Sequence, residues 1–409
     1  MLDPEYIRKN PDAVRQMLVD RAMDPTLLDV FLKVDETWRA HVATGDGLRA
    51  RLNALSRERK IEAARMVKQE LTAHEGKGNG LEQERHEALA ALPNMHAPDV
   101  PIGASDKENV VLRTWPQDSV PERRGKTFYG LGADLGIIDT ERASKVAGTR
   151  FGYLVGGAAL LEFALVRFAM DTLTREGFIP VIPPVMVKPD ILIGMGKRKF
   201  MKDDDLFFIE KDKLYLAGSS EHTIGPMHKD ETFDAADLPR RYVGSSTCFR
   251  RESGSYGKDT RGILRVHQFN KVEMFSFTTP DASEAEHQFL LSLEEQFMQQ
   301  LELPYRVVAI CTGDMGFGDY RQYDIEAWFP GSGEYRETHS CSNTGDYQAR
   351  GLQMKYRDAG GTHHLHTLNA TVFSQRPILA ILENYQQRDG SVQVPKALQG
   401  YVGLREIVR

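Results

Sequence analysis

The stretch between Ser246 and Phe275 concentrates residue types that could carry out phosphate and nucleotide chemistry. It opens on the apolar pair Cys248 and Phe249, passes through a segment rich in glycine, serine and charge, and ends in an alternating run that begins at Val266. A strand, a long polar loop and a second strand predict an antiparallel hairpin. Loops of this length inside compact domains more often serve function than structure.

Four side chains would lie on or beside this hairpin. Arg250 and Arg265 offer two fixed cations. Phe269 adds an aromatic face and Glu273 a carboxylate. Arginine binds phosphate in a forked geometry, and an aromatic ring stacks on a base. The set suits a nucleoside triphosphate and a cationic amine, although the spacing alone is equally typical of a charged surface hairpin.

Composition bounds the class of protein. Of 409 residues, 41% are hydrophobic and 27% charged, as in a soluble globular protein of two domains. The net charge of −6 argues against nonspecific nucleic-acid binding but leaves room for a local basic surface. The polar N-terminus does not resemble a signal peptide, and no stretch reaches the roughly 20 apolar residues of a membrane span.

The three cysteines, Cys248, Cys311 and Cys341, form no metal-ligand pattern, so we expect buried thiols in a reducing cytoplasm.

The N-terminal region has the apolar spacing of helices. A short helix is predicted over 4–22 with Asp3 as its cap, and apolar residues recur at steps of three and four over 27–92. Two such helices could form an antiparallel coiled-coil hairpin, although the pattern slightly favours an ordinary pair of bundle helices. Glycines at 45, 47, 76, 78 and 80, which cost about 1 kcal/mol each in a helix interior, predict breaks in the helices. A linker rich in proline and polar residues follows over 93–120.

The rest of the chain predicts many strands between few helices, hence an α+β fold with an antiparallel sheet flanked by helices. The segment 157–176 has the pattern of an amphipathic helix, and the prolines of the strand over 178–184 predict an edge strand or a strand at an unusual interface. Further helices are expected over 283–301 and 378–384, and further strands over 206–209, 213–216, 305–311 and 323–329.

Five sequence runs give the chain a family resemblance. They are TCFRRESGSYGKDTRG from Thr247, RVHQFNKVEM from Arg265, CTGDMGF from Cys311, YDIEAWFPGSGEYRETHSCSNTGDYQAR from Tyr323, and HTLNAT with RPILAILENYQ from His366. In this order they resemble the class II aminoacyl-tRNA synthetases in their seryl-tRNA synthetase form. The resemblance implies a helical, coiled-coil-like tRNA-binding arm domain over 1–100, a linker over 101–120 and a class II catalytic domain over 121–409. It also implies a homodimer built on the first motif, over 157–184.

Nucleotide-binding roles follow from the resemblance. Arg250 would bridge the amino-acid carboxylate and the α-phosphate, Glu252 would contact the adenine amino group, and Phe269 would lie under the adenine. Arg265 and Arg376 would reach the γ-phosphate, with Arg376 also over the other face of adenine. Arg250 and Arg376 are the expected catalytic residues. The full expected ATP-binding set is Arg250, Arg251, Glu252, Arg265, Phe269, Glu337, Thr338, His339, Ser340 and Arg376.

Magnesium would be held by Glu337 and Ser340. Attack of a carboxylate on an α-phosphate brings anions together, so arginines and Mg²⁺ must neutralise charge. No general base is needed because the carboxylate is already ionised.

Serine would be bound next to the nucleotide. The expected serine-binding set is Ser219, Ser220, Glu221, Arg250, Glu273 and Thr371. Within it, Glu273 and Thr371 occupy the positions that hold the substrate amine and hydroxyl in the family. Ser219 replaces the threonine of the family's Thr-x-Glu loop and keeps the hydroxyl. The spacing from Asn369 to Arg376 is one residue shorter than is usual.

The implied reaction makes seryl-adenylate from L-serine and ATP, and transfers serine to tRNA(Ser) and, by the same resemblance, to tRNA(Sec). The basic residues Arg57, Arg59 and Lys60 of the arm would contact the tRNA backbone. One alternative is a synthetase-like ligase that loads a non-tRNA acceptor such as a carrier protein, and the glycine-interrupted arm motivates it. A binding protein with a decayed site is a third interpretation, against which the intact site residues argue.

Overall fold

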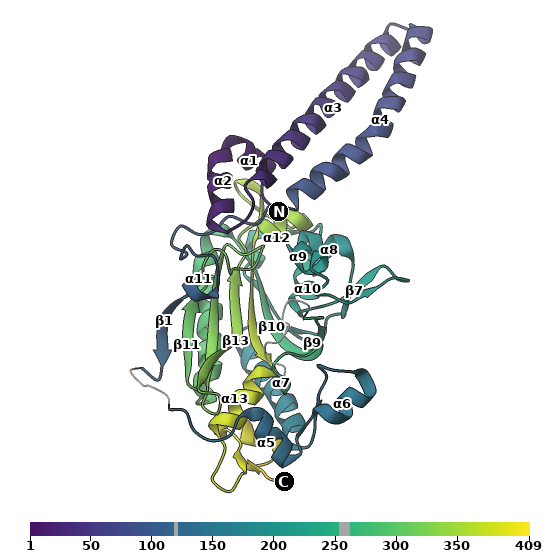
Figure 1. Ribbon diagram of the computed structural model, residues 1–409. Coiled ribbons are helices and arrows are strands. Elements are labelled where there is room, and N and C mark those ends of the chain that lie inside the picture. The colour runs from purple at the N-terminus through teal and green to yellow at the C-terminus, as the bar shows by residue number, and fades with distance from the viewer. Residues whose placement is uncertain (118–121, 253–261) are drawn as a thin grey trace. The chain divides into compact units, whose positions relative to one another are not determined.

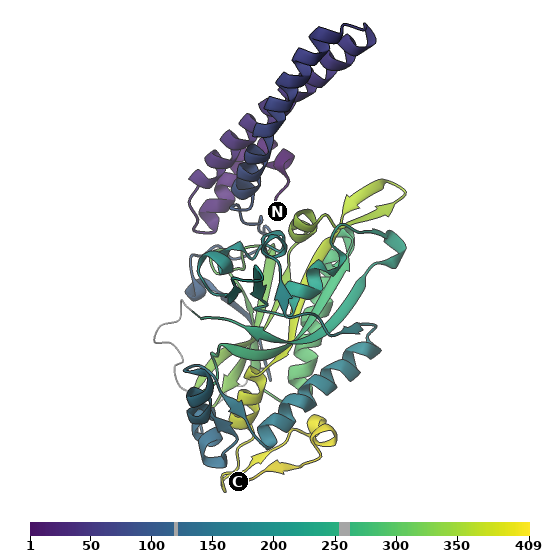
Figure 2. The same cartoon turned by 90° about the vertical axis from the view of Figure 1, so that its right-hand side faces the viewer.

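The computed structural model of the chain describes residues 1–117, 122–252 and 262–409, and Figures 1 and 2 show it from two sides. The chain divides into two compact units, Met1–Met95 and His96–Arg409. Within the described residues, no helix combines the length and the apolar character needed to cross a bilayer.

The N-terminal unit consists of helices, which are α1 (Pro4–Lys9), α2 (Pro11–Asp20), α3 (Thr26–Arg57) and α4 (Ile61–Leu89). The predicted cap is confirmed, since the Asp3 side chain accepts a hydrogen bond from the Glu5 amide. The prediction of one helix over 4–22 is wrong, because the helix is interrupted at Asn10. Proline disfavours helical backbone in the residue before it, and Pro11 instead starts α2.

Helices α3 and α4 pair along their length as a long antiparallel hairpin, visible in both views. Both run without a break through the glycines at 45, 47, 76, 78 and 80, so the predicted interruptions are wrong. Two of the five, Gly45 and Gly78, lie where the helices meet, whereas a Cβ on Gly47, Gly76 or Gly80 would meet nothing within 4 Å. The rings of His41 and His74 stack between them with centroids 3.7 Å apart. A Cβ on Gly78 would lie 3.0 Å from His41, and one on Gly45 3.4 Å from His74. Packing across the pair thus offsets the poor helix propensity.

An ion cluster joins three of these helices near Asp35. Its carboxylate is fully buried and contacts Arg8 of α1 at 3.1 Å, Arg39 of α3 at 2.9 Å and Arg85 of α4 at 2.7 Å. Burial alone would raise the pKa of Asp35, but the hydrogen bonds from Arg85 and Arg39 outweigh it and lower that pKa. Asp35 is therefore the charged centre of the base of the hairpin.

The C-terminal unit is built on an eight-stranded sheet in the order β1-β11-β12-β13-β16-β10-β9-β4. Every neighbouring pair is antiparallel except β4 with β9, which is parallel. The bounds are β1 (Val110–Trp115), β4 (Ile179–Val181), β9 (Arg240–Phe249), β10 (Gln268–Thr278), β11 (Tyr305–Ala309), β12 (Arg321–Phe329), β13 (Glu334–Asn343) and β16 (His366–Ser374). The sequence-based prediction of an antiparallel sheet with a proline-bearing edge strand, β4, is confirmed.

Three longer helices pack on the sheet and contribute to its core together with the strands. They are α7 (Gly157–Arg175), α11 (Ser283–Gln300) and α13 (Arg376–Asn384). Leu161 of α7, Phe297 of α11 and Ile381 of α13 join one apolar cluster with strand residues such as Val272 and Val372.

Shorter elements complete the unit. The helices are α5 (Phe128–Leu135), α6 (Thr140–Ala147), α8 (Pro189–Gly194), α9 (Arg198–Lys202), α10 (Glu221–Ile224), α12 (Tyr347–Leu352) and α14 (Lys396–Val402). The strands are β2 (Ile138–Asp139), β3 (Tyr153–Leu154), β5 (Met186–Val187), β6 (Phe208–Ile209), β7 (Leu214–Leu216), β8 (Thr232–Asp234), β14 (Lys355–Asp358), β15 (Gly361–His364), β17 (Val392–Gln393) and β18 (Glu406–Ile407). The predicted hairpin of β6 and β7 is present.

Candidate active site

A cavity of about 280 Å³ opens over the sheet where β10, β12, β13 and β16 run side by side. Successive side chains of a strand point to opposite faces. Phe269 and Lys271 of β10 therefore line the cavity, while Val272 and Met274 belong to the apolar core. The predicted hairpin of β9 and β10 is confirmed, with Phe269 opposite Cys248.

Arg250 directly follows the last residue of β9, and hydrogen bonds hold its backbone and its side chain. Its amide donates to the carbonyl of His267 at 3.0 Å, and its Nε donates to the carbonyl of Gly218 at 2.9 Å. The guanidinium carbon lies 5.5 Å from the centroid of Phe269, a cation–π distance. A cation and a ring held together in this way are the two groups expected at the α-phosphate and the adenine.

Glu252 and Arg265 lie beside this pair. Arg265 Nη1 is 3.2 Å from Glu252 Oε2, and Glu252 has a left-handed backbone with φ of +54°. Left-handed backbone is costly for a residue other than glycine and tends to occur at functional sites. Arg150 Nη1 holds it in place by donating to the Glu252 carbonyl at 2.9 Å.

Arg376 and Glu337 close another side of the cavity. Arg376 Nη1 lies 3.1 Å from Glu337 Oε2 and donates to the Glu337 carbonyl at 2.9 Å. Burial would raise the pKa of Glu337, but the adjacent Arg376 more than compensates and lowers it. Glu337 therefore stays ionised, the state in which a carboxylate can bind a cation.

Asp324 of β12 was not predicted from the sequence. Gln322 Nε2 joins it to the expected metal ligand Ser340, donating to Asp324 Oδ1 at 2.9 Å and to Ser340 Oγ at 3.1 Å. Burial, and then the charge of Glu337, raise the pKa of Asp324 well above its usual range. Carboxylate and hydroxyl oxygens suit Mg²⁺, which usually keeps few protein ligands and several waters or phosphates. In keeping with that habit, no group of three or more His, Cys, Asp or Glu within residues 1–117, 122–252 and 262–409 could hold a metal by itself.

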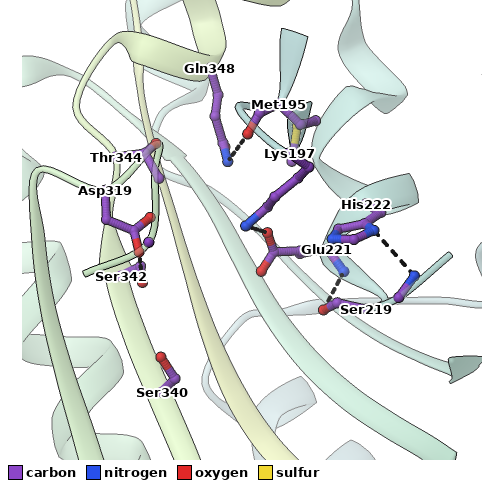
Figure 3. Close-up of polar contacts among 12 residues, drawn as sticks. Met195, Lys197, Ser219, Glu221, His222, Asp319, Ser340, Ser342, Thr344 and Gln348 are labelled. Atoms are coloured by element: carbon purple, nitrogen blue, oxygen red, sulfur yellow. Dashed lines mark hydrogen bonds and ion pairs between the residues drawn. The ribbon is translucent and has the colours of Figure 1, made fainter. Parts of the chain in front are cut away.

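The amino-acid end of the cavity contains two lysines that were not predicted. Lys271 Nζ lies 2.8 Å from Glu273 Oε2 and donates to Ser219 Oγ at 3.1 Å. Lys197 Nζ lies 2.5 Å from Glu221 Oε1, as Figure 3 shows. The alternation of Phe269, Lys271 and Glu273 along β10 would have identified Lys271, but no local pattern marked Lys197.

Glu273 is fully buried under Lys271 and does not belong to the lining formed by the described residues. Burial raises the pKa of Glu273 to about 7, against the opposing charge of Lys271. Thr371 of β16 lies directly opposite Glu273 in the register and faces the cavity. The pairing of β10 with β16 shifts register between Val272 and Glu273, which places a bulge in β16 just after Thr371. This bulge lies within the segment from Asn369 to Arg376 that is one residue shorter than usual.

The structure brings most of the predicted residues to this one cavity. Its lining includes Glu221, Arg250, Glu252, Arg265, Phe269, Glu337, Thr338, Ser340, Thr371 and Arg376. The other predicted residues of this unit lie outside that lining, namely Ser219, Ser220, Arg251, Glu273 and His339. Ser220 is buried and donates to the carbonyl of Lys271 at 2.9 Å. Arg251 packs over the ring of Phe207 at 4.6 Å, and His339 is buried against the Thr338 hydroxyl.

The predicted tRNA-binding residues belong to the N-terminal unit. Arg57 ends α3, and Arg59 and Lys60 form the turn before α4, all of them exposed. Lys60 pairs with Glu58 at 2.7 Å.

An antiparallel sheet that carries arginines, an aromatic ring and carboxylates around one cavity is the arrangement expected of a class II aminoacyl-tRNA synthetase. Residues 206–385 match the tRNA synthetase class II core domain (G, H, P, S and T), and residues 1–96 match the seryl-tRNA synthetase N-terminal domain. The chain belongs to the seryl-tRNA synthetase family, whose members are serine–tRNA ligases.

Individual relatives are similar to this chain along nearly its whole length. The serine–tRNA ligase of Acidothermus cellulolyticus is 46% identical over 98% of each chain. That of Rubrobacter xylanophilus is 42% identical over 100% of this chain and 99% of its own. The crystal structure of seryl-tRNA synthetase from Pyrococcus horikoshii complexed with ATP has a TM-score of 0.92 and 38% identity, covering 100% of this chain and 99% of that one.

Proposed function

We propose that this chain activates L-serine with ATP at the cavity and transfers serine to tRNA(Ser), and also to tRNA(Sec). In the first step a serine carboxylate oxygen attacks the α-phosphorus, the bond to the β-phosphate breaks, and pyrophosphate leaves. In the second step a terminal ribose hydroxyl of tRNA attacks the adenylate carbonyl, and AMP leaves. The observation that carries the proposal is the placement of Arg250, Arg265, Phe269 and Arg376 around one cavity beside Thr371 and Glu221.

Each residue has a role set by its charge. Arg250 would contact the charge that develops as the carboxylate and the α-phosphate meet, so it stabilises the transition state more than the bound substrates. Arg265 and Arg376 would neutralise the outer phosphates, and Phe269 would support the adenine. Glu337 and Ser340 would hold Mg²⁺, which supplies further positive charge at the phosphates.

A homodimer is the proposed assembly, built on α7 and β4. Apolar side chains on these elements and beside them are exposed, with Phe163 at 73% and Ile182 at 94%. Leu160 and Ile179 add to the exposed apolar surface. A group of exposed apolar side chains is typical of an interaction surface, and a second copy of the chain is the expected partner.

The cytoplasm is the proposed compartment. All three cysteines are buried and free of disulfides, which suits a reducing environment.

Transfer to a carrier protein is the alternative to transfer to tRNA. The observation that favoured it was an arm broken by glycines, and the continuous α3 and α4 remove that observation. Serine-dependent pyrophosphate exchange tests the activation step. Charging of purified tRNA(Ser) tests the acceptor, and exchange without charging would favour the carrier protein.

A further inference from the structure

Lys197 is a buried cation at the amino-acid end of the cavity. It lies between α8 and α9, its side chain is 16% exposed, and its ammonium contacts Glu221 at 2.5 Å. Figure 3 shows it extending from the loop toward Glu221 at the start of α10. The side chain of an exposed lysine samples many conformations, whereas the side chain of Lys197 is enclosed by the fold.

The loop that carries Lys197 is held from several sides. Gly196 has φ of +75°, and the Lys197 amide donates to the Leu192 carbonyl at 2.8 Å, the pattern of a helix C-cap. Gln348 Nε2 donates to the Met195 carbonyl at 3.3 Å. The position of the Lys197 backbone is therefore fixed by the fold, so its ammonium is directed to the cavity before any substrate binds.

A second carboxylate lies near Lys197, on the side away from Glu221 (Figure 3). Asp319 lines the same cavity, is 5% exposed, and accepts a hydrogen bond from Ser342 Oγ at 3.0 Å. Burial would lower the pKa of Lys197, but the charges of Glu221 and then Asp319 outweigh it and raise that pKa. Lys197 therefore stays charged, in contact with Glu221 and under the longer-range attraction of Asp319.

The charges at this end add up to one unit. Glu221 and Asp319 contribute two negative charges and Lys197 one positive charge. Lys271 and Glu273 are in contact and cancel while Glu273 is ionised, which requires a pH at or above its raised pKa of about 7. Burial lowers the pKa of His222 to about 3, so this neighbour of Glu221 is neutral. Arg250 also lines the cavity and is assigned to the amino-acid carboxylate, so among the described residues one net negative charge is left for the ammonium of the ligand.

We propose that Lys197 is a specificity-determining residue that sets this charge, so that the site accepts an amino acid with one ammonium and rejects a diamine of the same size. The diamine that tests this is L-2,3-diaminopropanoate, which carries an ammonium where serine has its hydroxyl. Without Lys197 the end would carry two negative charges and would match two ammoniums. The inference rests on the proposed placement of the serine amine at this end.

The experiment measures kcat/KM in pyrophosphate exchange for serine and for the diamine at one pH slightly above 7, where Glu273 is largely ionised, and expresses the diamine value per doubly protonated molecule. Lys197→Met should shift the ratio toward the diamine by roughly 10- to 100-fold, the effect of one charge at close range in a partly buried site. Asp319→Asn should shift it the other way and raise the KM for serine. The double variant restores the net charge, so its ratio should return to within a few-fold of the parent ratio.

Two control variants separate charge from structure. Lys197→Arg keeps the charge and should keep the ratio. Lys213→Met removes an exposed lysine paired with Glu210 and should leave the ratio unchanged. Equal losses for both substrates in Lys197→Met, or shifts of the same sign in Lys197→Met and Asp319→Asn, would overturn the inference. If Lys197→Met does not fold, the directions in which Asp319→Asn and the double variant shift the kcat/KM ratio still test the inference. A parent protein with no serine-dependent exchange would overturn the proposed function together with this inference.

Discussion

Replacing Asp35 with asparagine should loosen the base of the α3–α4 hairpin while leaving the active site intact. Three arginine nitrogens lie 2.7 to 3.1 Å from its two oxygens. Hydrogen bonds to a charged group contribute about 1.5–3 kcal/mol each. The arginines are 19%, 31% and 49% exposed and recover part of their hydration when the charge is lost. We therefore expect a net loss near the lower end of the usual range for breaking a buried ion pair, about 3 kcal/mol.

Hydrogen exchange on the full-length protein, followed by mass spectrometry, can measure this loss. Amides of α3 and α4 should lose protection by roughly 100-fold, since about 1.4 kcal/mol corresponds to a factor of ten. Serine-dependent pyrophosphate exchange should be unchanged, whereas tRNA charging should fall. Asp29→Asn is the matched control, because the pair of Asp29 with Arg15 is exposed on both sides and should contribute little to stability.

The pH dependence follows from the direction of the pKa shift. The folded pKa of Asp35 is lowered, so its contribution is complete above the ordinary value of 3.8. It is lost as the pH falls below that value toward the lowered folded pKa. Measurements at neutral pH therefore sample the full effect. Equal protection of α3 and α4 in Asp35→Asn and Asp29→Asn would refute the reasoning.

Three further predictions concern the substrates. Arg250→Ala should nearly abolish pyrophosphate exchange while circular dichroism and the mass in solution stay unchanged, because in the proposed mechanism Arg250 would contact charge that develops only during the reaction; parental exchange would remove Arg250 from the site. Thr371→Val should reduce the preference for serine over alanine in exchange by at least 10-fold, since a site that binds a hydroxyl discriminates through its own polar groups; an unchanged ratio would contradict this. Replacing Arg57, Arg59 and Lys60 together with alanine should weaken tRNA binding and reduce its salt slope by about 2 to 3, with parental exchange; the same slope in parent and variant would argue against phosphate contacts at the tip.

The sheet and the gathering of Arg250 and Phe269 at one cavity could be predicted because their signals are local. Alternation along β10 fixes which side chains share a face, and Arg250 and Phe269 lie on one hairpin whose pattern is visible in the sequence. Lys197 and Asp319 could not be predicted in this way. They come from loops more than a hundred residues apart and meet only once the chain has folded.

The errors have physical causes of the same kind. Helix propensity is a property of single residues, whereas Gly45 and Gly78 lie where a neighbouring helix supplies a histidine ring. Propensity therefore predicted breaks that packing prevents. The role of Glu273 at the substrate amine stays a prediction, to which the structure adds the contact of Lys271 with this carboxylate.

The alternation of cavity and core residues along β10 also limits how this enzyme can change over evolutionary time. Phe269 and Lys271 share one strand with Val272 and Met274 of the core. A deletion of one residue here would exchange the two faces and would place a lysine in the apolar core. Substitutions at single positions can thus accumulate one at a time, whereas changes in the length of this strand should be removed by selection. Laboratory libraries aimed at new amino-acid substrates should therefore vary side chains on β10 and confine insertions to segments outside the sheet.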